Sequence, residues 1–259
     1  MEMTNEQGRP IGATGDAVLR TLAMKARGMS GADIERLVRE ARQKARRAHR
    51  QLAFSDVFDL LAAARPQRSQ ALRWRVAIHE AGHAVARLVL GLGHITSIGI
   101  DSPAGGYTEG TTPTMDAETE AFFDGLLAVS LAGRAAEEEF LGSVTAGAGG
   151  SPESDMGKAT ALALAMETEL GFAETWSLLY RQAENQSALL AYNPLLADQV
   201  NARLEAAYVR VRRLVRRNED ALRLLANALM QHGTLEGAAL AAVLQEVRER
   251  MMAEPASGG

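Results

Sequence analysis

Hydrophobic residues recur at helical spacing near the start of the chain, and Ser30, just before them, is a residue type that commonly caps a helix N-terminus. The residues at i, i+3, i+4 and i+7 of this stripe are Ile34, Leu37, Val38 and Ala41. Another apolar group over residues 54–63 predicts a second short helix. Residues 64–69 are polar and contain a proline, so we expect a linker there.

The next part of the chain combines a helical pattern with strand-like ones. A helix is predicted from Ala71 to Gly91. Residues 94–100 alternate between faces and are rich in β-branched side chains, which is typical of a short strand. Residues 105–108 begin with two glycines, and we expect a turn into another strand.

Helical patterns dominate the remainder. We predict a helix over 118–141, a flexible glycine-rich loop over 142–150, and a helix that starts at Ser151 with Pro152 in its first turn. Residues 193–252 are almost purely helical in pattern, with breaks at 217–220 and 232–234. The fold class that follows is mainly α with a small β-sheet. The predicted boundaries are 1–14 for a disordered N-terminal segment, 15–65 for a helical domain, 71–252 for a larger domain and 253–259 for a flexible tail.

The composition is that of an ordinary globular protein, with 47% hydrophobic and 23% charged residues. The chain has no cysteine, which excludes a disulfide scaffold, a thiolate zinc site, an iron–sulfur cluster and a cysteine nucleophile. Any metal would therefore be held by imidazole, carboxylate, thioether or backbone ligands.

Charge and hydropathy limit the cellular setting. The net charge of −4 does not favour nucleic acid, and the basic residues 42–50 are interpreted as a solvated helix face because no aromatic residue interleaves them. No stretch approaches the roughly 18 apolar residues that a transmembrane helix needs, and the first 14 residues lack a signal-peptide core. We expect a cytoplasmic protein, or one at the cytoplasmic face of a membrane if it belongs to a longer chain.

Residues 79–83 read His-Glu-Ala-Gly-His inside a predicted helix. Residues at i and i+4 project from one helix face, so the imidazoles of His79 and His83 can bind one Zn²⁺. Glu80 lies beside the open coordination position, where it can accept a proton from a water bound to the metal. The small residues Ala81, Gly82 and Ala84 would let another helix approach closely.

A catalytic zinc site of this kind needs a third protein ligand. Two carboxylates are candidates: Glu137 on the predicted helix with a small-residue face, and Asp155 after the glycine-rich loop. Local chemistry does not decide between them.

Three segments give the chain a specific resemblance. Residues 79–84 read HEAGHA, residues 133–138 read GRAAEE, and residues 149–160 read GGSPESDMGKAT. Together they resemble the peptidase domain of the FtsH family of ATP-dependent zinc metalloproteases. The resemblance implies one Zn²⁺ per chain held by His79, His83 and Asp155. It further implies that Glu80 is the general base and that Glu137 orients an imidazole.

The resemblance covers about residues 15–250. Residues 29–41 are similar to part of the family's ATPase lid, so 15–65 is interpreted as a lid remnant and 71–252 as the zinc peptidase domain. The segments 218–225 and 234–237 match the family's closing helices. Departures are Ser154, where the family has asparagine, one extra loop residue, and Gly-Phe-Ala at 171–173.

The phosphate-binding loop of the family's ATPase core is absent, so we predict no ATP binding by this chain alone. The resemblance implies hexamers and unfolded or flexible polypeptide substrates, coupled to ATP-driven unfolding in a full-length parent. Residues 105–107 could form an edge strand that pairs with substrate, or an ordinary hairpin turn. The alternative function is a non-catalytic oligomerisation or adaptor module that docks on a complete protease.

Overall fold

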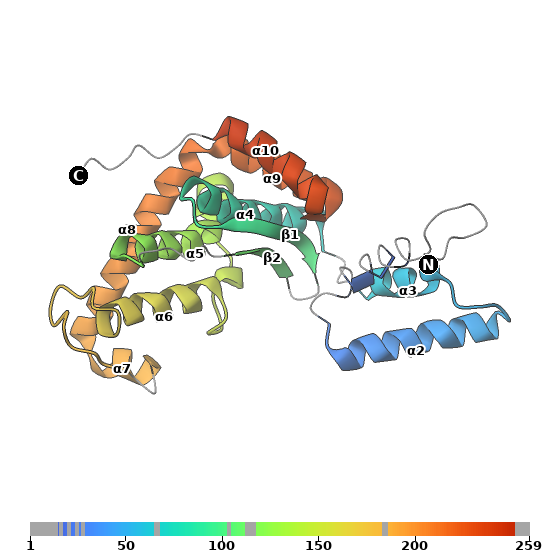
Figure 1. Ribbon diagram of the computed structural model, residues 1–259, viewed down its shortest axis with the longest axis horizontal. Coiled ribbons are helices and arrows are strands. Elements are labelled where there is room, and N and C mark those ends of the chain that lie inside the picture. Colours follow the sequence, from blue (N-terminus) through green and yellow to red (C-terminus); the bar gives the residue numbers. More distant parts are fainter. Residues whose placement is uncertain are drawn as a thin grey trace, which may run out of the picture. The chain divides into compact units, whose positions relative to one another are not determined.

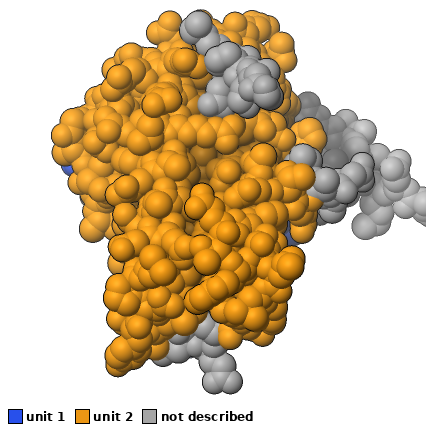
Figure 2. Space-filling model, turned by 90° about the vertical axis from the view of Figure 1, so that its left-hand side faces the viewer, with its two compact units in different colours: residues 1–69, 101–105 blue, residues 70–100, 106–259 orange. Residues whose placement is uncertain are grey.

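A computed structural model describes residues 29–64, 68–102, 105–111, 118–182 and 186–251, together with a few residues between 15 and 26. The predicted disordered segment over 1–14, the tail over 253–259 and part of the linker over 64–69 lie outside or partly outside these ranges. The chain divides into one unit of residues 1–69 and 101–105 and another of residues 70–100 and 106–259, the latter drawn in orange in Figure 2.

The first unit contains two helices that pack on each other, α2 (Gly31–Arg47) and α3 (Phe54–Ala63). Ser30 is the N-cap of α2, as predicted, and its hydroxyl accepts a hydrogen bond from the Asp33 amide at 3.2 Å. The turn between the helices is fixed by Arg50, whose guanidinium donates two hydrogen bonds of 2.6 Å to Asp56. The pair is bidentate, and two hydrogen bonds fix the relative orientation of the two side chains more closely than one hydrogen bond does.

The core of the second unit forms around α4 (Gln70–Val89), which packs most extensively on α5 (Glu120–Leu141) and also on α9 (Glu219–His232). α5 packs in turn on α8 (Pro194–Arg217) and on α6 (Asp155–Thr168). The middle of α4 is buried on nearly all sides, and apart from His79, Glu80 and His83 its residues there are small or aliphatic.

The small residues of α4 permit a close helix crossing, as the sequence indicated. A Cβ atom on Gly82 would lie 2.7 Å from both the Ala132 carbonyl oxygen and the Ala136 Cβ of α5. Both obstacles are rigid, one being backbone and the other the first atom of a side chain. The two helix axes can approach this closely only because residue 82 has no side chain.

We therefore expect Gly82→Ala to destabilise the second unit even though alanine favours helices. The overpacking should cost about 1–3 kcal/mol in the free energy of unfolding, measured by urea denaturation. Gly31→Ala is the matched control, because a Cβ at that helical position of the first unit meets no atom within 4 Å. Equal stability of the Gly82→Ala protein and the wild type would contradict the crossing described here.

The sheet has three strands in the order β2-β1-β3, with β1 (His94–Ser102) in the centre and β2 (Gly105–Thr111) at one edge. β3 (Thr234–Glu236) occupies the second break expected in the C-terminal helices and pairs antiparallel with β1, with Ile98 opposite Leu235. The sequence pattern predicts a helix break there, and the strand is a finding of the structure. Both Ile98 and Leu235 are buried, so the pair adds apolar area to the core.

The loop before α6 corrects one expectation. The predicted helix was to start at Ser151 with Pro152 in its first turn, but α6 begins at Asp155. Ser154 is its N-cap: the hydroxyl accepts from the Gly157 amide at 3.2 Å and donates to the Ser151 carbonyl at 2.6 Å. Because the Ser154 hydroxyl satisfies a free amide of the first helical turn, the helix starts at Asp155, four residues after the predicted start. The glycine-rich loop holds a short 3₁₀ turn, η1 (Ala146–Ala148).

The remaining helices complete a mainly α fold with a small sheet, which confirms the predicted class (Figure 1). They are α7 (Gln186–Tyr192) and α10 (Gly237–Arg250), the latter packed on α9 and β3. In the part of the chain that the structure describes, no helix is both long enough and apolar enough to cross a lipid bilayer.

Candidate metal centre

The structure brings His79, His83 and Asp155 together. The two histidines lie one turn apart on α4, and their Nε2 atoms are 3.1 Å apart. Asp155 is the first residue of α6, and its Oδ2 lies 3.1 Å from Nε2 of His79 and 3.3 Å from Nε2 of His83. These three are the one group of metal-ligating side chains that converges among the described residues.

The three ligand atoms fit one small ion. Around a tetrahedral zinc with bonds of about 2.0–2.1 Å, neighbouring ligand atoms stand about 3.3–3.4 Å apart, close to the separations seen here. Gly133 of α5 keeps the same space clear, because a Cβ on this residue would overlap Nε2 of both His79 and His83. The donor set of two imidazoles and one carboxylate also suits zinc.

Hydrogen bonds on the far side of each imidazole fix its orientation. Nδ1 of His83 lies 2.8 Å from the Val129 carbonyl oxygen, to which it can only donate. Nδ1 of His79 lies 2.8 Å from the Glu137 carboxylate. Donation from both Nδ1 atoms leaves both Nε2 atoms available as ligands, which is the arrangement that metal-binding histidines usually have.

Glu137 is itself held in place from the opposite side. Its carboxylate is buried and accepts hydrogen bonds from Arg75 at 2.9 Å and from the Thr145 amide at 3.0 Å. Arg75 also binds the carbonyl and the hydroxyl of Ser143, so α4, α5 and the loop that follows α5 are joined at this point. Glu137 thus contacts the outer nitrogen of His79, whereas Asp155 faces the inner nitrogens of both histidines.

The electrostatics of the cluster favour a positive charge at His79. Burial lowers the pKa of the His79 imidazole, but hydrogen bonds to Asp155 and Glu137 outweigh it and raise the pKa to about 10. Burial would raise the pKa of both carboxyls, yet their hydrogen bonds to the histidines hold each pKa below its ordinary value. A metal cation that displaced the proton from Nε2 would meet the Asp155 carboxylate, while Glu137 would keep its hydrogen bond to Nδ1 of His79.

Glu80 lies apart from the three convergent atoms. Its side chain is 6% exposed, and one carboxylate oxygen accepts a hydrogen bond of 2.8 Å from the Thr108 hydroxyl of β2. Burial raises the pKa of the Glu80 carboxyl, opposed by the charges of His83 and His79. A buried carboxylate with a raised pKa is suited to proton transfer near neutral pH.

Four neighbours of the cluster were not identified from the sequence: the donors Thr108 and Arg75, the acceptor Val129, and Gly133 in its role of leaving space. Gly133 stands inside the GRAAEE segment, but no pattern in one sequence distinguishes a glycine that clears a ligand site from one that helps helices to pack. The other three depend on which elements cross α4, and this is not encoded in local spacing.

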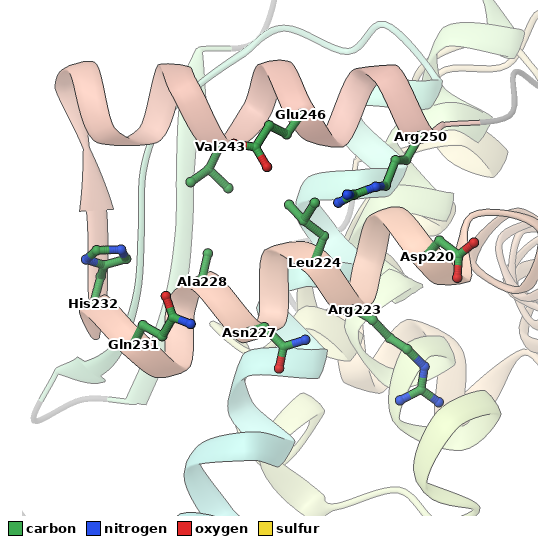
Figure 3. Close-up of a pocket in the computed structure, with 10 residues that line it drawn as sticks. All are labelled: Asp220, Arg223, Leu224, Asn227, Ala228, Gln231, His232, Val243, Glu246 and Arg250. Atoms are coloured by element: carbon green, nitrogen blue, oxygen red, sulfur yellow. The ribbon is translucent and has the colours of Figure 1, made fainter.

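A second concave feature lies elsewhere in the same unit, between α9 and α10 (Figure 3). It has a volume of about 630 Å³. Its lining includes two acidic residues, Asp220 and Glu246, and two basic ones, Arg223 and Arg250. Neither sign of charge predominates.

Residues 67–243 match peptidase family M41. The chain belongs to peptidase family M41. This membership confirms both the predicted family and the predicted class of enzyme, a peptidase. The match spans the whole of α4, α5 and α6, the helices that carry the cluster.

Curated relatives agree with membership in M41. The chain is 30% identical to an ATP-dependent zinc metalloprotease FtsH 1 of Sphaerobacter thermophilus, over 95% of this chain and 40% of that protein. It is 32% identical to an ATP-dependent zinc metalloprotease FtsH of Chloroflexus aggregans, over 93% of this chain and 40% of the relative. The FtsH protein of Bacillus subtilis is 28% identical, over 84% and 38%. The chain thus spans about two-fifths of the length of these relatives.

Proposed function

We propose that the chain is a zinc-dependent endopeptidase of the FtsH type that cleaves unfolded or flexible polypeptides. In this proposal His79, His83 and Asp155 hold one Zn²⁺ and Glu80 is the general base. The observation that carries it is the convergence of three ligand atoms from two helices at the space that Gly133 leaves open. Zinc in the names of the M41 relatives supports the choice of metal.

The side chains have distinct tasks in this mechanism. When bound, zinc lowers the pKa of a coordinated water and polarises the scissile carbonyl. Glu80 accepts a proton from the attacking water and delivers it to the leaving amine. Glu137 and the Val129 carbonyl keep the two imidazoles in the tautomer that turns Nε2 inward.

We propose that the substrate is an extended polypeptide that lies along β2. The sheet order supports the edge-strand interpretation over a simple turn, because among the described residues β2 has a partner strand on one side only. A peptide added there would be recognised through its backbone, with little preference for sequence. Such a mode requires that the substrate be unfolded locally, since the backbone of a folded strand is already paired.

The proposal includes coupling to ATP, but only for a longer protein that contains this chain. The relatives are named ATP-dependent and are about two and a half times as long as this chain. We propose that this chain alone binds no ATP, that it assembles as a homo-oligomer, a hexamer by family resemblance, and that unfolding of folded substrates requires an ATPase region outside it.

The experiment that tests the proposed function combines zinc analysis with hydrolysis of unfolded casein. We expect one zinc per chain and casein cleavage that a chelator stops and added zinc restores. Stoichiometric zinc without cleavage would contradict the general-base mechanism. A protein that takes up no zinc under any condition would instead favour the non-catalytic adaptor module.

Gly133→Ala tests the metal centre without altering any ligand. The added methyl group overlaps Nε2 of both histidines, so we expect zinc affinity to fall by about 10–100-fold or more, as measured against a competing chelator. Gly125→Ala on the same helix is the control, because its Cβ meets only the end of the Leu92 side chain, at 3.0 Å. Unchanged zinc affinity in Gly133→Ala would place the ion elsewhere.

A further inference from the structure

The edge strand β2 contacts the carboxylate of Glu80 on two sides. Gly106 and Thr108 are two residues apart and so point to the same face of the strand. The Thr108 hydroxyl donates a hydrogen bond of 2.8 Å to Oε2 of Glu80. At Gly106, a Cβ would overlap Oε1 of the same carboxylate and would lie 2.6 Å from the Val76 side chain.

These contacts leave Glu80 little freedom. The carboxylate is buried, and within the described ranges Thr108 is its hydrogen-bond donor. A glutamate side chain rotates about three covalent bonds. A hydrogen bond to a fixed partner restricts these rotations and so holds the carboxylate of a base closer to one position. Thr108 is held by its place in a strand and by the branch at its own Cβ, which restricts χ1.

The two oxygens of Glu80 consequently differ. Oε2 is engaged by the Thr108 hydroxyl, whereas Oε1 faces Gly106, a residue that has no side chain of its own to cover it. A carboxylate anchored through one oxygen presents the other in a defined direction. General bases act efficiently only when that direction brings them within about 2.6–3.2 Å of the proton to be moved.

We propose that Thr108 is a positioning residue for Glu80: its hydroxyl holds the carboxylate in the orientation from which the free oxygen takes a proton. The inference rests on the proposed function, because it assigns Thr108 a role only if Glu80 is the base. It also connects the strand along which the substrate is proposed to lie with the group proposed to transfer the proton, because Thr108 of β2 contacts Glu80.

The test compares Thr108→Val with Thr108→Ser in the full chain loaded with zinc. Valine keeps the branched shape and removes the hydroxyl, while serine keeps the hydroxyl. For a fluorogenic peptide we expect valine to lower kcat by about 10–100-fold with little change in KM, and serine to stay within about threefold of the wild type. Zinc affinity and the thermal midpoint of the metal-free protein should change little in either variant.

Thr160→Val is the matched control, because Thr160 is a half-buried threonine of α6 whose hydroxyl donates to the Met156 carbonyl of its own helix, at 2.8 Å. Full kcat in Thr108→Val, with an active wild type and an inactive Glu80→Gln protein, would overturn the positioning role and leave the proposed function standing. Equal losses in the valine and serine variants with lower thermal midpoints would show a structural role instead. A zinc-loaded wild type that cleaves nothing would overturn the proposed function and this inference together.

Discussion

Substitution of Glu80 by glutamine is expected to leave zinc bound and to abolish cleavage of unfolded casein. Glutamine has nearly the same shape and can still accept the Thr108 hydrogen bond, but it cannot take up a proton at neutral pH. Loss of a general base costs about 10²–10⁴-fold in rate, so activity should fall to the limit of detection. Zinc content and casein hydrolysis, measured on the same preparation, give the result.

The control for this substitution is Glu205→Gln, on an exposed face of α8, which should retain full activity. Casein cleavage at the wild-type rate by Glu80→Gln would refute the role of Glu80. Loss of zinc from that variant would show instead that Glu80 supports the metal centre, in spite of lying apart from the three convergent atoms.

Replacement of Asp155 by alanine should weaken zinc binding far more than replacement of Glu137 by alanine. Asp155 offers its oxygen to the inner nitrogens of both histidines, whereas Glu137 contacts only the outer nitrogen of His79. Loss of a carboxylate behind a ligand costs about 10–100-fold in metal affinity, and loss of a ligand should cost more. Competition with a chromophoric chelator measures both values.

Urea unfolding of both metal-free variants is needed beside the affinities, because Glu137→Ala also leaves the partly buried Arg75 without its carboxylate partner. A ranking in which Glu137→Ala binds zinc more weakly than Asp155→Ala, at comparable stability, would show that the ligand assignment is wrong.

Helical periodicity was sufficient to predict that His79 and His83 share a face, because four residues make about one turn. The same reasoning could not choose a third ligand. Asp155 lies 72 residues beyond His83, and its position depends on how α6 packs beside α4 and α5, which no local pattern specifies. The family resemblance, rather than local chemistry, singled out Asp155, and its role as a ligand stays a prediction.

Two details that the sequence did not predict have different causes. β3 has three residues, too few for an alternating pattern, and it becomes a strand only because β1 offers hydrogen bonds opposite it. The start of α6 at Asp155 follows from the capping hydrogen bonds of Ser154, which are local. A tertiary partner therefore decides the structure at β3, whereas a local cap decides where α6 begins.

Because β3 is short, the two edge strands of the sheet differ in length. In the described part of the chain β3 has only three residues, and at Gly237, which has a φ of +55°, the chain turns away into α10. Short terminal strands of this kind discourage molecules from joining sheet to sheet into aggregates. The seven residues of β2 form the longer edge among the described strands, so an incoming chain would find more backbone to pair with there, beside Glu80, than at β3.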